Sequence, residues 1–80
     1  MSLPVLLFAR YADLLGASEV RVTVPMGATV ADAVQQVRAL PGGGGLPEQP
    51  VCAINLSQVP ASTVLQLGDE LALLPPVAGG

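Results

Sequence analysis

The pattern that most constrains the fold is one amphipathic helix set between segments with β-strand patterns. Its apolar residues recur at the spacing i, i+3, i+4 and i+7: Val30, Ala33, Val34 and Val37. Thr29 precedes them as a helix cap, with Asp32 three residues on as a shortened capping box, and Leu40, Pro41 and Gly42 end the helix. Because so narrow a Val-rich stripe forms a stable helix only against a partner surface, the sequence predicts one helix packed on a sheet.

The remaining segments predict the strands of that sheet. Residues 3–9 are a continuous apolar run, typical of a central strand, and residues 19–24 alternate strictly, typical of a half-buried strand paired with the first. Further strands are expected at 51–56, briefly near Val59, and at 70–74. This order predicts an α+β fold of the β-grasp (ubiquitin-like) class. Its mixed sheet has one main helix across one face, and the first and last strands are central neighbours.

Two parts of the chain are distinguished, a β-grasp domain at 1–74 and an extended tail at 75–80. Pro75 and Pro76 end the last strand because neither has a backbone N–H to donate, and they favour an extended chain. Gly79 and Gly80 have no Cβ, so the end of the chain can enter a slot too narrow for other residues. The pattern predicts a carboxylate on a thin arm of ~20 Å. Composition alone also allows a frayed tail.

The side-chain inventory excludes several classes of function. The 80 residues contain no His, no Lys and one Cys. This excludes the usual zinc and iron–sulfur sites, Ser-His or Cys-His nucleophile pairs and an internal disulfide. With three Arg and a net charge of −3, nucleic acid is not an expected partner. We therefore expect a protein that holds no metal or cofactor and is not catalytic alone.

The apolar run at 3–9 is too short to span a bilayer. It also lacks the basic flank and the small-residue cleavage site of a signal peptide. We therefore expect no membrane association and a cytoplasmic location.

Phe8 and Leu74 are predicted to lie on the sheet face opposite the helix. Side chains alternate along a strand, so if Val5 and Leu7 face the helix, Phe8 faces away from it. An uncovered apolar patch of Leu6, Phe8 and Leu74 would mark a protein interface. Ordinary core is the alternative, because a slip of one residue reverses the two faces.

Other candidate residues are expected to have structural rather than functional roles. Cys52, within an apolar run, is expected to be a small buried hydrophobe. Asp69 and Glu70 are adjacent, so they point to opposite faces and are expected to have turn and solvent roles. Residues 42–45 lack the Lys-Ser/Thr of a phosphate loop and are expected to be a flexible connection. Arg10 could pair with a partner's carboxylate or simply be solvated.

Several segments resemble, in the same order, the small subunit of molybdopterin synthase, the MoaD-type β-grasp sulfur carriers of the MoaD/ThiS family. They are Leu7-Phe8-Ala9-Arg10, Gly27-Ala28-Thr29-Val30-Ala31-Asp32, Ala53-Ile54-Asn55 and the closing segment 68–80. The specific part is Gly-Asp-Glu at 68–70 followed by Pro-Pro-Val-x-Gly-Gly at 75–80.

The resemblance implies a sulfur carrier whose terminal Gly80 is the reacting residue. In that family an E1-like adenylyltransferase uses ATP and magnesium to adenylate the terminal glycine, and a sulfurtransferase then leaves a thiocarboxylate. The carrier docks into the large subunit, as a heterotetramer built on a large-subunit dimer. Its sulfur passes to cyclic pyranopterin monophosphate in molybdenum cofactor biosynthesis. Partner binding is assigned to the sheet face and the tail: Phe8, Leu74, Pro75, Pro76, Val77, Ala78 and Gly79.

Two alternatives remain open from the sequence. One is a carrier for thiamine or for another thiocarboxylate-dependent pathway, although thiamine carriers usually lack the Pro-Pro-Val lead-in. The other is a non-catalytic ubiquitin-like interaction module whose tail is inert.

Overall fold

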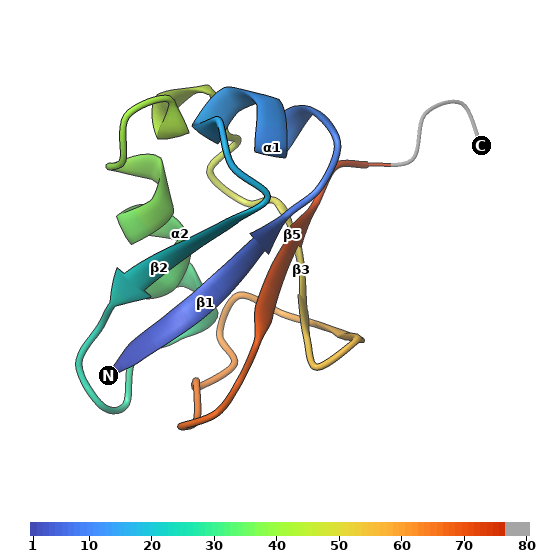
Figure 1. The fold of residues 1–80 in the computed structure, drawn as a ribbon. Coiled ribbons are helices and arrows are strands. Elements are labelled where there is room, and N and C mark those ends of the chain that lie inside the picture. Colours follow the sequence, from blue (N-terminus) through green and yellow to red (C-terminus); the bar gives the residue numbers. More distant parts are fainter. Residues whose placement is uncertain (77–80) are drawn as a thin grey trace.

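The computed structural model describes residues 1–76 of the chain. A five-stranded sheet forms the body, with α2 behind it and α1 at one end (Figure 1). The elements in chain order are β1 Ser2–Leu7, α1 Arg10–Leu15, β2 Glu19–Thr23, α2 Val30–Arg38, the 3₁₀ turn η1 Gly43–Gly45, β3 Val51–Ile54, β4 Ser57–Val59 and β5 Leu71–Leu74.

The sheet has the predicted mixed topology. Its strand order is β2-β1-β5-β3-β4, so the first and last strands lie side by side in the centre. β1 and β5 run parallel, and every other neighbouring pair is antiparallel. The predicted α+β β-grasp architecture is therefore confirmed.

The core lies between the sheet and α2, and the predicted helical stripe faces it. All four stripe residues are buried: Val30, Ala33, Val34 and Val37. The capping box is also present, because the Asp32 N–H donates to Thr29 Oγ1 (3.3 Å) and the Thr29 N–H donates to Asp32 Oδ2 (2.9 Å). Across residues 1–76, none of the helices has the length and apolar character needed to cross a membrane.

Helix α1 is absent from the sequence prediction, which continued the first strand to residue 9. The strand ends at Leu7 because Ala9 has a φ of +50°, outside the range of a β-strand. The carbonyl of Phe8 accepts from the Tyr11 N–H (3.0 Å) and opens the first helical turn. Tyr11, only 1 % exposed, anchors the helix in the core. The predicted turn at Gly16 is the left-handed residue that ends α1.

The third strand also ends earlier than predicted, at Ile54 rather than 56. Asn55 and Leu56 have φ values of +48° and +74°, and they connect the paired residues Ile54 and Ser57. Two such residues form the tight turn that suits the twist of a hairpin. The predicted short edge strand near Val59 is the returning strand, β4.

Residues 42–45 are not the flexible connection that their composition suggested. They form a turn packed between the two helices, and Gly43 is buried. A Cβ on Gly43 would lie 2.1 Å from the carbonyl oxygen of Val37, and one on Gly42 would lie 2.0 Å from that of Leu14. The glycines are needed because backbone approaches backbone too closely for any side chain.

This packing predicts unequal effects at two neighbouring glycines. Gly43→Ala should lower the free energy of unfolding by about 2 kcal/mol or more, because the new methyl group overlaps the end of α2. Gly44→Ala is the matched control, since a Cβ there meets nothing within 4 Å. Urea unfolding followed by circular dichroism measures both, and equal stability of the two variants would contradict the packed turn.

Candidate functional site

The chain leaves the sheet from its centre, beside the end of β1. The parallel register places Leu7 opposite Leu73, so the carboxyl ends of β1 and β5 lie at the same end of the sheet. Figure 1 shows the red end of β5 passing the connection from β1 to α1. Pro75 is half-buried and Pro76 is exposed. The base of the tail therefore lies next to Phe8.

The two faces of the central strands differ in burial. Val5 and Leu7 are buried on the helix side, and Leu71 and Leu73 are buried beside them. Leu6, on the other face, is only half-buried. Of the two arrangements that the sequence left open, the structure therefore has the one in which Val5 and Leu7 face the helix.

The opposite face of the sheet is an apolar band that α1 and α2 leave uncovered. The register aligns Leu6 with Ala72, Ala72 with Ala53, and Leu74 with Val51. We call this band the outer apolar face. Its residues are Pro4, Leu6, Val51, Ala53, Ala72 and Leu74, of which Ala53 is buried and the others are half-buried or exposed. Such a band with polar borders is typical of a protein interface.

Polar side chains border the outer apolar face on both edge strands. Glu19 and Arg21 of β2 pair with Leu6 and Pro4, and both polar side chains are exposed. Gln58 of β4 pairs with Ala53 on the other side and is also exposed. The polar Gln58 thus limits the width of the band on this side.

Phe8 lies one residue beyond β1 rather than within it. Its backbone opens α1, yet its side chain remains 45 % exposed at the base of the tail. Arg10 is exposed as well, with its guanidinium carbon 5.7 Å from the centroid of the Tyr11 ring. The structure therefore brings Phe8, Leu74, Pro75 and Pro76 together at one edge. The other tail residues assigned to the site lie outside the described residues: Val77, Ala78, Gly79 and Gly80.

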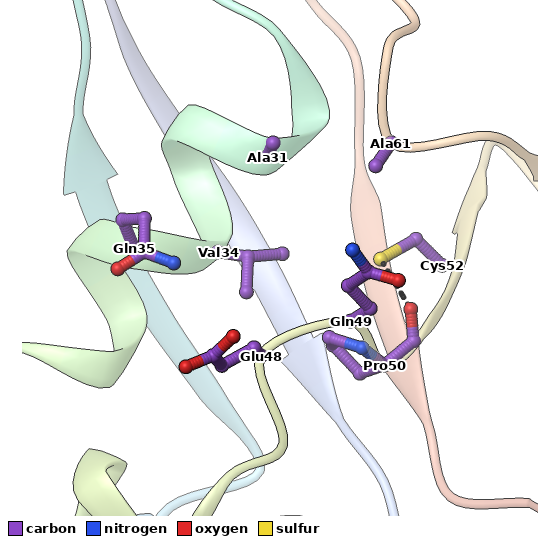
Figure 2. Close-up of a pocket in the computed structure, with 8 residues that line it drawn as sticks. All are labelled: Ala31, Val34, Gln35, Glu48, Gln49, Pro50, Cys52 and Ala61. Carbon is purple, nitrogen blue, oxygen red and sulfur yellow. Dashed lines mark hydrogen bonds between the residues drawn. The ribbon is translucent and has the colours of Figure 1, made fainter.

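Cys52 is a buried thiol on the helix side of the sheet. Burial raises its pKa from 9.0 to about 11, and its Sγ donates to the Pro50 carbonyl at 3.3 Å. Figure 2 shows it on the wall of a small pocket of about 180 Å³ between α2 and residues 48–50. A protonated thiol of this kind is not a nucleophile at neutral pH. The prediction of a small buried hydrophobe is confirmed.

Asp69 stabilises a turn and is not half of a catalytic carboxylate pair with Glu70. Its Oδ2 accepts from the Gln66 N–H (2.8 Å), and its Oδ1 accepts from Asn55 Nδ2 (3.3 Å). Asn55 also accepts from the Glu70 N–H (3.2 Å) and so ties the start of β5 to the β3–β4 hairpin. The linking role of Asn55 was not predicted. Within residues 1–76 no cluster of three potential metal ligands occurs.

A mixed sheet with one main helix on one face and a carboxyl-terminal segment leaving its centre defines a ubiquitin-like β-grasp protein. The chain belongs to the ThiS family, whose model matches residues 5–80. It is 32% identical over 81 residues to a molybdopterin synthase sulfur carrier subunit of Arabidopsis thaliana, covering 100% of this chain and 84% of that protein. The resemblance found in the sequence is confirmed, and the chain is a homologue of MoaD/ThiS sulfur carriers.

Solved structures have the same fold. SAMP1, the small archaeal modifier protein 1 of Haloferax volcanii, superimposes with a TM-score of 0.84 at 32% identity, over 100% of both chains. A chain of the complex of subunits 1 and 2 of molybdopterin-converting factor from Helicobacter pylori gives a TM-score of 0.71 at 21% identity, over 100% of both chains. This second likeness shows the shared fold.

The raised pKa of Cys52 predicts an alkaline loss of stability. Between pH 9 and 11 the unfolded thiol has lost a proton that the folded thiol keeps, so the free energy of unfolding falls as the pH rises through this interval. Cys52→Ala removes this contribution and is the reference. Urea unfolding at pH 8, 9.5 and 10.5 should show the wild type losing more stability than Cys52→Ala. A difference between the two that does not change with pH would contradict the buried thiol.

Proposed function

We propose that this protein is the sulfur-carrier small subunit of molybdopterin synthase and that Gly80 is its reacting residue. The observation that carries the proposal is the 32% identity to a sulfur carrier subunit over 100% of this chain. The closing Pro-Pro-Val-x-Gly-Gly of the sequence supports it, because thiamine carriers usually lack the Pro-Pro-Val lead-in. The exit of the chain from the centre of the sheet supports it as well.

The proposed chemistry needs no acid or base from this chain. A free carboxylate is a poor electrophile, so an E1-like adenylyltransferase with ATP and magnesium joins AMP to Gly80 and releases pyrophosphate. A sulfur nucleophile delivered by a sulfurtransferase then attacks the carbonyl carbon, and AMP leaves with the electron pair of the broken C–O bond. The resulting thiocarboxylate is ionised at neutral pH, and it donates sulfur to cyclic pyranopterin monophosphate. The catalytic groups belong to the partners, which agrees with a chain that has no His and no Lys.

In this proposal the chain docks on its partner proteins and presents its carboxyl end to them. The outer apolar face, with Phe8, Leu74 and the two prolines at the base of the tail, would lie against each partner. Val77, Ala78 and Gly79 would pass through a narrow channel, for which the final glycines lack an obstructing Cβ. The Helicobacter pylori protein of this fold was solved with a second subunit. We propose a corresponding larger subunit here, in a heterotetramer, within the cytoplasm.

A second candidate is a protein modifier. SAMP1 of Haloferax volcanii, a modifier by name, is 32% identical over 100% of both chains. In this case the activated Gly80 would acylate an amine of another protein instead of accepting sulfur.

The tail mechanism predicts loss of function without unfolding. Gly79→Val, or one residue added after Gly80, should abolish molybdenum cofactor synthesis in cells that lack their own carrier. The valine side chain would not fit the proposed channel, and an added residue would replace the carboxyl group of Gly80 as the terminal one. Circular dichroism should show an intact domain, and Gly44→Ala should retain synthesis as the control. Retained synthesis with either tail change would contradict the mechanism.

The docking face predicts a selective loss of partner affinity. Phe8→Asp should weaken binding to the larger subunit by about tenfold or more, because a buried charge would replace an aromatic anchor. Val64→Asp is the matched control: Val64 is 47% exposed against 45% for Phe8, but it pairs with Thr29 away from the outer apolar face. Titration calorimetry with the purified larger subunit measures both. Equal weakening by the two substitutions would exclude the assigned face.

A further inference from the structure

Ala9 has a backbone conformation that residues other than glycine rarely adopt. Its φ is +50° and its ψ is −127°, and the Tyr11 N–H donates across it to the carbonyl of Phe8 (3.0 Å). The first central residue of a type II′ turn has a φ of about +60° and a ψ of about −120°, and glycine is favoured there because a Cβ crowds the backbone. The chain therefore turns at residues 8–11 as in type II′, with alanine in the glycine position, and α1 continues from this turn.

Hydrogen bonds hold the backbone of Phe8 on both sides. The Leu7 N–H, before it, donates to the Ser18 carbonyl (2.9 Å), and the Phe8 carbonyl accepts from the Tyr11 N–H. The side chains of Leu7 and Tyr11 are both buried in the core. Phe8 thus lies between two fixed points, while its own side chain stays 45 % exposed.

The start of α1 depends on the same turn. Within residues 1–76, no side chain caps this end of the helix, and the Ala9 carbonyl accepts from the N–H groups of Ala12 (3.0 Å) and Asp13 (3.3 Å). Tyr11 is the one buried residue within α1. A strained residue persists only where its surroundings hold it. Loss of the turn at Ala9 would therefore release the backbone of Phe8 and the first turn of α1 together.

We propose that Ala9 is a positioning residue for partner binding, because the turn that it forms holds Phe8 in its exposed place beside Leu74 and the base of the tail. The inference rests on the proposed function, in which Phe8 is an anchor for the larger subunit. An anchor whose backbone is already fixed loses less conformational entropy on docking than a mobile one, so it binds more tightly. Ala9 contributes to affinity through Phe8.

The first test needs no partner, because Phe8 is the single phenylalanine of the chain. Protein produced with para-fluorophenylalanine carries fluorine at this residue alone, and fluorine NMR then reports its surroundings. Ala9→Gly should keep the single resonance of the wild type and raise the urea midpoint by about 0.5 M, because glycine suits a type II′ turn. Ala9→Val should shift and broaden the resonance, because a β-branched residue does not tolerate this φ. An unchanged resonance in a folded valine variant would overturn the proposal.

The second test is a double-mutant cycle with the purified larger subunit, measured by titration calorimetry. Ala9→Val and Phe8→Ala should each weaken binding by about fivefold or more. In the Phe8→Ala background, Ala9→Val should change the dissociation constant by less than about twofold, because no aromatic anchor is left to position. Effects that multiply instead would show that Ala9 acts independently of Phe8, and the proposal would be wrong. Ala9→Gly should bind at least as tightly as the wild type.

Circular dichroism checks that each variant is folded. If the valine variant does not fold, Ala9→Leu replaces it in both tests, since leucine has no branch at Cβ and fits the turn less badly.

The inference and the proposed function can fail separately. A chain that does not bind the larger subunit in any form would contradict the proposed function, and the fluorine spectra would still decide whether Ala9 holds Phe8. Binding that is weakened by Phe8→Ala but shows no coupling to Ala9 would support the proposed docking and contradict the inference.

Discussion

The parallel pairing of β1 with β5 is the constraint on which the rest of the molecule depends. It places β1 and β5 in the centre of the sheet, where Val5, Leu7, Leu71 and Leu73 are 0–3 % exposed. It also requires that the chain leave the sheet where β1 ends, beside Phe8. The same direction of the strands puts the amino terminus at the opposite end of the sheet from the base of the tail (Figure 1). One pairing thus buries the core and positions the base of the tail.

Covering only one face of the sheet has a functional consequence. The main helix, α2, buries its stripe against one side, and the other side keeps an apolar band bordered by Glu19, Arg21 and Gln58. In the proposed function this band would be the docking surface. The chain would then supply its shape and its carboxyl end, and its partners would supply the catalytic groups.

Periodic features could be predicted from the sequence, whereas features created by tertiary contact could not. The stripe of α2, its capping box and the strand order follow from local patterns, and all three are present. Helix α1 is too short to show a period, and nothing about Ala9 signals its positive φ. The close approach at Gly43 depends on where Val37 lies, so composition alone suggested flexibility. For the site, alternation predicted that neighbouring residues of β1 and β5 face opposite ways but not which face the helix covers, and the role proposed for the tail came from resemblance to a family.

In the proposed function, Gly80 carries sulfur as a thiocarboxylate. Its most direct test is the intact mass of the protein after incubation with the E1-like enzyme, ATP, magnesium and a sulfur source. The account predicts a gain equal to one oxygen atom replaced by sulfur, located by fragmentation in the carboxyl-terminal peptide. An unchanged mass, with an enzyme shown to modify another carrier, would contradict it and leave a β-grasp binding module.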